Sequence, residues 1–267
     1  MEADGFTIVK NKKKKQTKGF HERRTTILSS ESIEIIFDSE ALKKRINSAV
    51  IDVESSEYFV QVVETVQSRV NHSIISLDSV YCFGLGHFAD SVTAKYQLAL
   101  LLAIASRLRL RPQQVFISDP IFYKGEVEFL KSELKFNVLT ENIECRLPCD
   151  QPTLILLPHC PKQLTNNLLF SNWSQEKLKN LFIFSNSINN IISNKNLQFI
   201  RAVIDNGIVC ETQLKNNFKY SDIFNDLSLH TFGAPDNIES SVWSLPEPAY
   251  EKEDAEFIKR SEEVDKV

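Results

Sequence analysis

The residues with the clearest chemical potential lie in the turn that follows an apolar run at Ser79–Phe83. Gly84 and Gly86 bracket Leu85, and His87 comes directly after them. Glycine allows a turn with positive φ and lets a ligand approach the main chain closely. Helical spacing starts a few residues later, and the free N–H groups of a helix N-terminus bind phosphate or carboxylate. The turn therefore predicts either a nucleotide-like ligand site or a tight turn with no ligand.

The fingerprint of a dinucleotide site is only partly present. In the pattern Gly-x-Gly-x-x-Gly, position 89 is Ala89 rather than glycine. Asp119 lies 33 residues after Gly86, which is farther than the acidic residue of a dinucleotide fold usually stands. Asp119 has the chemistry to accept hydrogen bonds from the ribose of an adenosyl cofactor in a methyltransferase-like enzyme. It has equally the chemistry to cap backbone N–H groups beside Pro120, and both alternatives stay open.

Later apolar runs also end in polar side chains. His159 and Cys160 come after a run at Thr153–Leu157, and Asn186 comes after another at 181–184. A histidine at a strand end serves as a general base, a metal ligand or a heme ligand, or is only hydrogen bonded at the surface. The pair Cys160-Pro161 matches a short element of some heme-responsive proteins. His159 and Cys160 are therefore candidate heme contacts.

Other kinds of site find little support in the residue spacing. The five cysteines contain no C-x-x-C pair, so no metal site is predicted and we expect reduced, partly buried thiols. The sequence contains no Ser-His-Asp elbow, P-loop or zinc-protease motif. The cofactor stays unknown at this point, with heme or an adenosine-containing ligand as the alternatives.

The elements that position these residues alternate between strands and helices. Apolar runs bounded by turns and separated by helices are typical of a parallel sheet buried on both faces. The strands are expected at Ser79–Phe83, Gln114–Ser118, Phe136–Leu139, Thr153–Leu157, Leu181–Phe184, Ile208–Leu214 and Leu227–Phe232. The helices are expected at Ser39–Asn47, Ser56–Asn71, Asp90–Leu110, Lys124–Leu134 and Lys162–Phe170. The fold class is therefore α/β, a Rossmann-like three-layer sandwich with a mostly parallel sheet and an antiparallel pair at one edge.

Ligands of such sheets bind outside the carboxyl ends of the strands, where the strand order reverses. In the common order 3-2-1-4-5, the first and fourth strands are neighbours, so His87 and His159 are expected to face one crevice. The candidate ligand-binding residues are Gly84, Gly86, His87, Asp119, His159 and Asn186.

Charge and composition suggest three regions. Residues 1–30 read as a flexible basic arm, because residues 1–25 carry a net charge of +5 in a chain of net charge −4. Residues 31–245 form the α/β domain, and residues 246–267 form a charged tail. The acidic remainder does not favour specific nucleic-acid binding. We expect no signal peptide, and the longest apolar stretch, Leu98–Ala105, is too short for a membrane span of about 20 residues.

Several blocks together resemble the SRR-like (sensitivity to red light reduced) domain family. The first blocks are Cys82–Gly86 and Ala94–Leu100, and the match runs in order across about residues 75–235. The later blocks are Asp119-Pro120, Leu139–Asn142, Pro158–Cys160, Asn166–Leu169, Asn172-Trp173 and Phe224–Asp226 running into His230.

The resemblance implies a regulatory protein rather than an established enzyme. Members of the family are associated with circadian clock input and, in animals, with heme biosynthesis. The resemblance also implies protein partners, which it does not identify, and a location in cytoplasm and nucleus. No catalytic residue can be transferred from it. A methyltransferase-like or other nucleotide-cofactor enzyme and a non-catalytic scaffold remain the alternatives.

Overall fold

The fold was analysed in a computed structural model, which describes residues 38–72, 76–189, 196–235, 238–250 and 257–259. The chain divides into residues 1–32 and 33–267, and all described residues belong to the second unit. The expected basic arm, residues 1–30, lies outside the described residues. The expected C-terminal tail is described only at residues 246–250 and 257–259.

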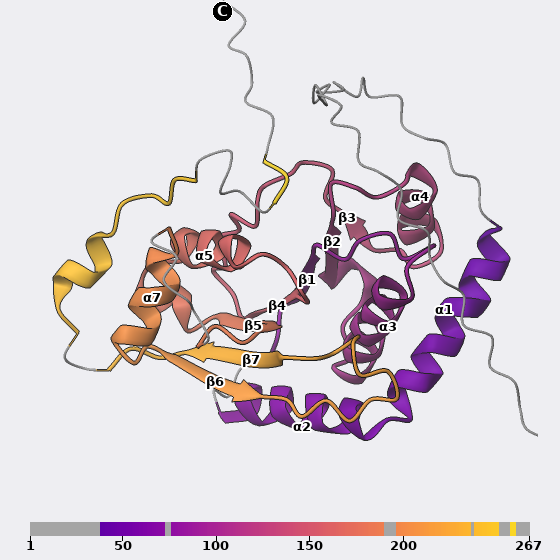
Figure 1. The fold of residues 1–267 in the computed structure, drawn as a ribbon, viewed down its shortest axis with the longest axis horizontal. Coiled ribbons are helices and arrows are strands. Elements are labelled where there is room, and N and C mark those ends of the chain that lie inside the picture. The colour runs from indigo at the N-terminus through magenta and orange to yellow at the C-terminus, as the bar shows by residue number, and fades with distance from the viewer. Residues whose placement is uncertain (1–37, 73–75, 190–195, 236–237, 251–256, 260–267) are drawn as a thin grey trace, which may run out of the picture. The chain divides into compact units, whose positions relative to one another are not determined.

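Seven strands form one sheet in the order β3-β2-β1-β4-β5-β7-β6 (Figure 1). The strands are β1 (Ser79–Phe83), β2 (Val115–Ser118), β3 (Asn137–Val138), β4 (Thr153–Leu157), β5 (Leu181–Asn186), β6 (Val209–Gln213) and β7 (Leu227–Phe232). The pairs from β3 through β5 are parallel, whereas β7 is antiparallel to both β5 and β6. The predicted α/β class with an antiparallel edge pair is therefore confirmed, and β7 lies inside the edge strand β6.

Helices cover both faces of the sheet. They are α1 (Ser39–Glu54), α2 (Glu57–His72), α3 (Val92–Arg107), α4 (Lys124–Ser132), α5 (Lys162–Ser171), α6 (Gln175–Leu178) and α7 (Gln198–Asp205), with short 3-10 turns η1 (Pro112–Gln114) and η2 (Ser240–Ser244). One hydrophobic cluster joins α1 to α4 to one face, and a second joins α5, α6 and α7 to the other (Figure 1). Alternate residues of the central strands enter the two clusters, as a three-layer sandwich requires.

The helix α3, which follows the glycine turn, has clear sequence signals at both ends. The Oγ atom of Ser91 accepts a hydrogen bond from the N–H of Ala94, so Ser91 caps α3. The helix is buried on nearly all sides between α1 and the sheet. Arg109 adopts a positive φ just beyond its C-terminus, and Pro112 follows in η1. The turn Gly84–Ser91 is thus held between a central strand and a buried helix.

The strand β5 and several helices differ from the prediction: α1 extends beyond Asn47 to Glu54, and α6 was not expected. The strand β5 is also longer than predicted. β5 continues through Ser185 and Asn186, which were expected to follow it, because β7 pairs with those two residues. The helix α7 was not predicted, although Phe199, Ile200 and Val203 bury one of its faces. It has only eight residues, so its apolar pattern is too short to be distinguished by spacing alone.

A buried charge stabilises the antiparallel edge. Glu211 on β6 lies opposite His230 on β7, and its Oε2 atom is 3.4 Å from the Nε2 atom of His230. The hydroxyl of Ser228 donates to the other carboxylate oxygen of Glu211 at 2.9 Å. Burial alone would raise the pKa of Glu211, but His230 and the hydroxyls of Ser187 and Ser228 outweigh it and hold the pKa at about 2. The carboxylate is therefore more stable in the folded chain than in the unfolded chain.

This depressed pKa predicts a pH-dependent stability. An unfolded glutamate has a pKa of about 4.3, so the contribution of Glu211 is complete above that pH and declines as pH falls toward 2. Replacing Glu211 by Gln should lower the free energy of unfolding by about 2 kcal/mol at pH 7, in urea titrations. The difference from wild type should shrink below pH 4, whereas Glu64→Gln, on the exposed side of α2, should cost less than about 0.5 kcal/mol. A difference that stays constant from pH 7 to pH 3 contradicts this account.

Candidate functional site

A cavity of about 270 Å³ lies at the carboxyl ends of β1, β2 and β4. It occupies the place where the strand order reverses, as expected for a ligand site of an open parallel sheet. Its described lining residues are Phe83, Gly84, Ser118, Asp119, Pro120, Ile121, Asn142, Ile143, Glu144, Cys145, His159, Cys160, Pro161, Leu164, Phe257 and Ile258. Of the six predicted ligand-binding residues, Gly84, Asp119 and His159 line this cavity.

Gly84 is required by the close approach of the turn after β4. Its φ is +67°, and a Cβ atom added there would lie 2.4 Å from the Sγ atom of Cys160. The Cys160 thiol donates to the carbonyl of Phe83 at 3.3 Å. Cys160 therefore fills the space that a side chain at position 84 would take, and the two turns are packed directly against each other.

Asp119 ties the turn after β1 to the turn after β2. Its Oδ2 atom accepts a hydrogen bond from the N–H of Gly86 at 2.7 Å, and Oδ1 accepts one from the N–H of Ile121 at 3.0 Å. Gly86 has a φ of +77° and does not line the cavity itself. A carboxylate offers about four acceptor positions, so Asp119 keeps two for a ligand. The capping role proposed for Asp119 is thus present, and it leaves the ligand-binding role open.

His87 is not among the described lining residues of this cavity, so the structure does not bring His87 and His159 together there as expected. The ring of His87 stacks on Tyr123 with a centroid distance of 3.6 Å, and its Nδ1 atom is 3.0 Å from Oε2 of Glu126. The fully buried carboxylate of Glu126 also accepts from the N–H groups of Ala89 and Tyr123. These contacts draw His87 toward α4, which the strand order alone does not reveal.

Glu126 was missed by the sequence analysis, and it changes what the glycine turn can bind. Its carboxylate accepts a hydrogen bond from the N–H of Ala89, which stands at the position of the third glycine in the dinucleotide pattern. A pyrophosphate at this place would meet a buried negative charge instead of free N–H donors. The available signal was its place in the first turn of α4, where an acidic side chain commonly caps the helix.

His159 is held by hydrogen bonds at both ring nitrogens. Asn186 accepts from the backbone N–H of His159 through Oδ1 at 2.7 Å, so its Nδ2 group faces the Nδ1 atom of the ring at 3.2 Å. The Nε2 atom is 3.0 Å from the carbonyl of Ile223. Because Asn186 donates and Ile223 accepts, this arrangement fits the neutral ring with its proton on Nε2. Asn186 thus supports His159 from behind the cavity.

The proposed heme contacts do not fit an iron ligand in this arrangement. Neither ring nitrogen of His159 is free. Burial raises the pKa of the Cys160 thiol to about 12, and the nearby Asp119 carboxylate adds to the shift. A thiol with this pKa stays protonated at neutral pH, whereas the thiolate is the form that binds metal.

Backbone strain is concentrated at the cavity. Six described residues other than glycine have a positive φ, and three of them, Glu144, Cys145 and His159, line it. Each such residue costs free energy, so it persists only where surrounding contacts impose it. Strain of this kind gathers at binding and catalytic sites, which supports a functional role for this cavity.

Buried asparagines in α5 and at its C-cap contact the part of that backbone between β3 and β4. Asn167 donates to the carbonyl of Glu144 at 3.0 Å, and Asn172 bonds both the N–H of Cys149 and the carbonyl of Leu147. Asn166 accepts from the first N–H groups of α7. Asn167 and Asn172 hold the loop between β3 and β4 against α5, whereas Asn166 holds the start of α7. The sequence analysis recognised these residues only as parts of the family blocks.

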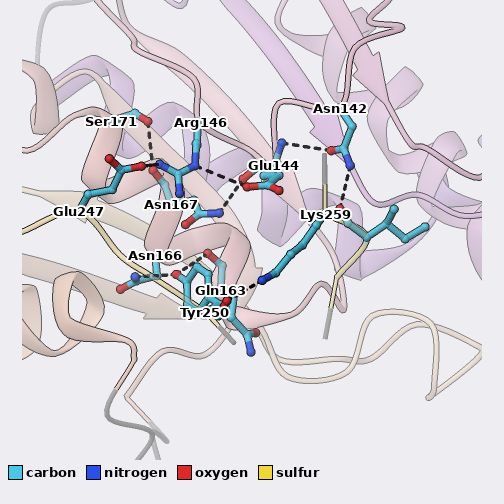
Figure 2. A network of polar contacts seen from close by, with 11 residues as sticks. Asn142, Glu144, Arg146, Gln163, Asn166, Asn167, Ser171, Glu247, Tyr250 and Lys259 are labelled. Carbon is cyan, nitrogen blue, oxygen red and sulfur yellow. Dashed lines mark hydrogen bonds and ion pairs between the residues drawn. The ribbon is translucent and has the colours of Figure 1, made fainter. Parts of the chain in front are cut away.

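The C-terminal part of the described chain completes the wall of the cavity, and Figure 2 shows its polar contacts. Asn142 donates to the carbonyl of Ile258 at 2.7 Å. Tyr250 accepts from Asn166 at 2.8 Å, and Arg146 forms an ion pair with Glu247. Residues 246–250 and 257–259 therefore pack against α5 and the loop between β3 and β4.

The described residues contain neither a metal-binding cluster nor a helix that could cross a membrane. Within the described part of the chain, no three His, Cys, Asp or Glu side chains lie close enough together to hold a metal ion. Across the same ranges, every helix is too short or too polar to cross a lipid bilayer.

Comparison with known proteins gives a consistent family match. A model of the SRR1 domain matches residues 54–231. The chain is 29% identical over 228 residues to an SRR1-like protein of Drosophila melanogaster, which covers 84% of this chain and 80% of the relative. It is 27% identical over 166 residues to the protein SENSITIVITY TO RED LIGHT REDUCED 1 of Arabidopsis thaliana, covering 59% of this chain and 60% of that protein. Among solved structures, the plantazolicin methyltransferase BpumL aligns with a TM-score of 0.38 at 13% identity, over 73% of this chain and 94% of that chain.

The contact between Gly84 and Cys160 gives a stability prediction. Gly84→Ala should lower the free energy of unfolding by about 2–4 kcal/mol, because it adds a clash to the strain of a positive φ. Gly207→Ala is the matched control, since Gly207 has a φ of +62° with no atom within 4 Å of the added Cβ, and it should cost only about 1–2 kcal/mol.

Adding Cys160→Ala to Gly84→Ala should recover the part of the loss that is due to the clash. Chemical denaturation of the two single variants and the double variant measures this coupling. Equal costs at positions 84 and 207, or strictly additive effects of Gly84→Ala and Cys160→Ala, would falsify the proposed contact.

Proposed function

Because the chain belongs to the SRR1 domain family, we propose that it is a regulatory protein whose α/β domain binds a small ligand in the cavity at the carboxyl ends of β1, β2 and β4. The observation that carries the proposal is the cavity itself, with three residues of positive φ in its wall. A surface that only stabilises loops has no need for this strain. In the proposed role, binding of the ligand changes how strongly protein partners bind the domain.

Family membership suggests the processes in which this regulation takes place. The name of the Arabidopsis relative links that protein to red-light sensitivity. We propose that the present chain acts in circadian clock input and in the regulation of heme biosynthesis, in cytoplasm and nucleus. Regulation of heme biosynthesis does not require this cavity to bind heme, and the engaged His159 ring and the protonated Cys160 thiol favour another ligand.

An enzyme with an adenosyl cofactor is the second candidate. Asp119 favours it, because this carboxylate follows β2, lines the cavity and keeps acceptor positions for ribose hydroxyls. Proton transfer is less well supported, since His87 lies outside the cavity and His159 has both ring nitrogens engaged. We therefore favour the regulatory role.

A thermal-shift panel tests ligand binding. Adenosylmethionine, a nicotinamide cofactor and heme are added separately to the full chain. A ligand at 100 times its Kd should stabilise the chain by about 2.7 kcal/mol, which raises Tm by about 5–10 °C for a protein of this size. Ile143→Trp places a larger side chain in the wall of the cavity and should abolish the shift, whereas Ile51→Trp on the exposed face of α1 should leave it unchanged.

The outcomes separate the candidates. A shift that Ile143→Trp removes supports binding in the cavity. If no compound raises Tm, or if the two tryptophan variants respond alike, the ligand-binding proposal fails and a non-catalytic scaffold is favoured. Transfer of a methyl group from adenosylmethionine to any acceptor would establish the second candidate instead.

A further inference from the structure

The charge of the cavity wall restricts what it can bind. Asp119 and Glu144 are the acidic residues of the described lining, and the same lining contains no Lys or Arg. Phosphate groups are bound in proteins by arginine, lysine or free backbone N–H groups. A phosphorylated ligand in this cavity would therefore lie beside carboxylates, without a cation among the described lining residues.

The two carboxylates differ in how far they are already neutralised. Glu144 lies 3.6 Å from the Nε atom of Arg146, whose guanidinium also pairs with Glu247 (Figure 2). Among the described residues, Asp119 has only the backbone N–H groups of Gly86 and Ile121 as hydrogen-bond donors. The negative charge that faces a ligand is thus chiefly that of Asp119, and it favours hydroxyl or cationic donors.

The glycine turn is also unsuited to binding a phosphate group. The buried Glu126 carboxylate takes the N–H of Ala89, at the point where a dinucleotide fold would present free donors to pyrophosphate. The helix α3 starts at Val92, and no residue of α3 lines the cavity. Neither the glycine turn nor the start of α3 therefore supplies an anion site to this cavity.

Apolar side chains form a large part of the remaining lining, beside the polar residues Ser118, Asn142 and His159. Pro120 and Ile121 lie next to Asp119 in the chain, and Ile143, Leu164 and Phe257 complete the apolar wall. Ligand sites of this kind combine apolar walls with a few polar groups that fix the orientation of the ligand.

We propose that this cavity selects an unphosphorylated nucleoside, neutral or cationic, whose vicinal hydroxyls donate to Asp119 and whose base lies against the apolar wall. The inference rests on the proposed function, because it names the class of ligand that the regulatory site takes. It applies equally to adenosine and to the adenosyl sulfonium of adenosylmethionine, and it implies weaker binding of AMP and dinucleotides at the site.

A second cavity must be kept apart from this one in any test. It has a volume of about 280 Å³ and lies at the amino-terminal ends of β5 and β6, where Arg69 and Lys179 contribute to its lining. Its cations could attract AMP independently. The affinity for AMP is therefore measured by displacement of bound adenosine, so that binding elsewhere does not contribute.

The experiment is competition calorimetry on the full chain with adenosine and AMP. Wild type should bind adenosine at least about tenfold more tightly than AMP, because one carboxylate close to a phosphate gives a repulsion of this order. Ile121→Lys adds a cation to the wall through a side chain that is 43% exposed, while its backbone N–H to Asp119 remains. This variant should reduce the ratio of the adenosine affinity to the AMP affinity at least several-fold. Ile51→Lys, with the same charge change on α1, should leave that ratio unchanged.

Each result bears on the proposal. AMP that displaces adenosine as readily as adenosine itself overturns the charge selection, yet leaves ligand binding in the cavity intact. Equal effects of Ile121→Lys and Ile51→Lys overturn it too, because the selection would then follow net charge alone. If adenosine does not bind, the nucleoside class is wrong, and the thermal-shift panel decides separately whether the cavity binds any ligand.

Discussion

The structure depends on one close contact, in which the Cys160 thiol lies over Gly84 at the centre of the sheet. β1 and β4 are neighbours, so the turns that follow them must pass within van der Waals distance. Glycine makes this possible, because it has no side chain and tolerates a positive φ. The turn is also fixed to β2, through the carbonyl of Ser118 and the carboxylate of Asp119. The cavity is the space that these three turns leave between them.

Polar contacts rather than apolar packing shape the outer wall of that space. Asn167 on α5 donates to the carbonyl of Glu144, which has a positive φ, and Asn166 on the same helix accepts from the N–H of Phe199 in α7. Asn186 holds His159 in the same way from β5. A network of this kind preserves one geometry, which is what a selective binding site requires.

Much of this arrangement follows from the sequence. The strands, their order and the edge pair were predictable, because buried parallel strands are continuous apolar runs with turns at their ends. Asp119 and His159 were identified as candidates because they follow such runs. Glu126 could not be found this way, since it belongs to a helix and reaches the turn from 39 residues away. His87 was predicted to face the crevice because its contact with Glu126 on α4 could not be foreseen from the sequence either.

The central claim is that the cavity at the carboxyl ends of β1, β2 and β4 is the ligand site of this domain. The most direct measurement is an NMR titration of the full chain, labelled with nitrogen-15, with adenosine. The account predicts that the amide signals of Gly84, Gly86 and Ile121 shift first, because these groups line the cavity or donate to Asp119. Shifts confined to Gly207 and Gly233, at the second cavity, with no change at Gly84 or Gly86, would contradict it.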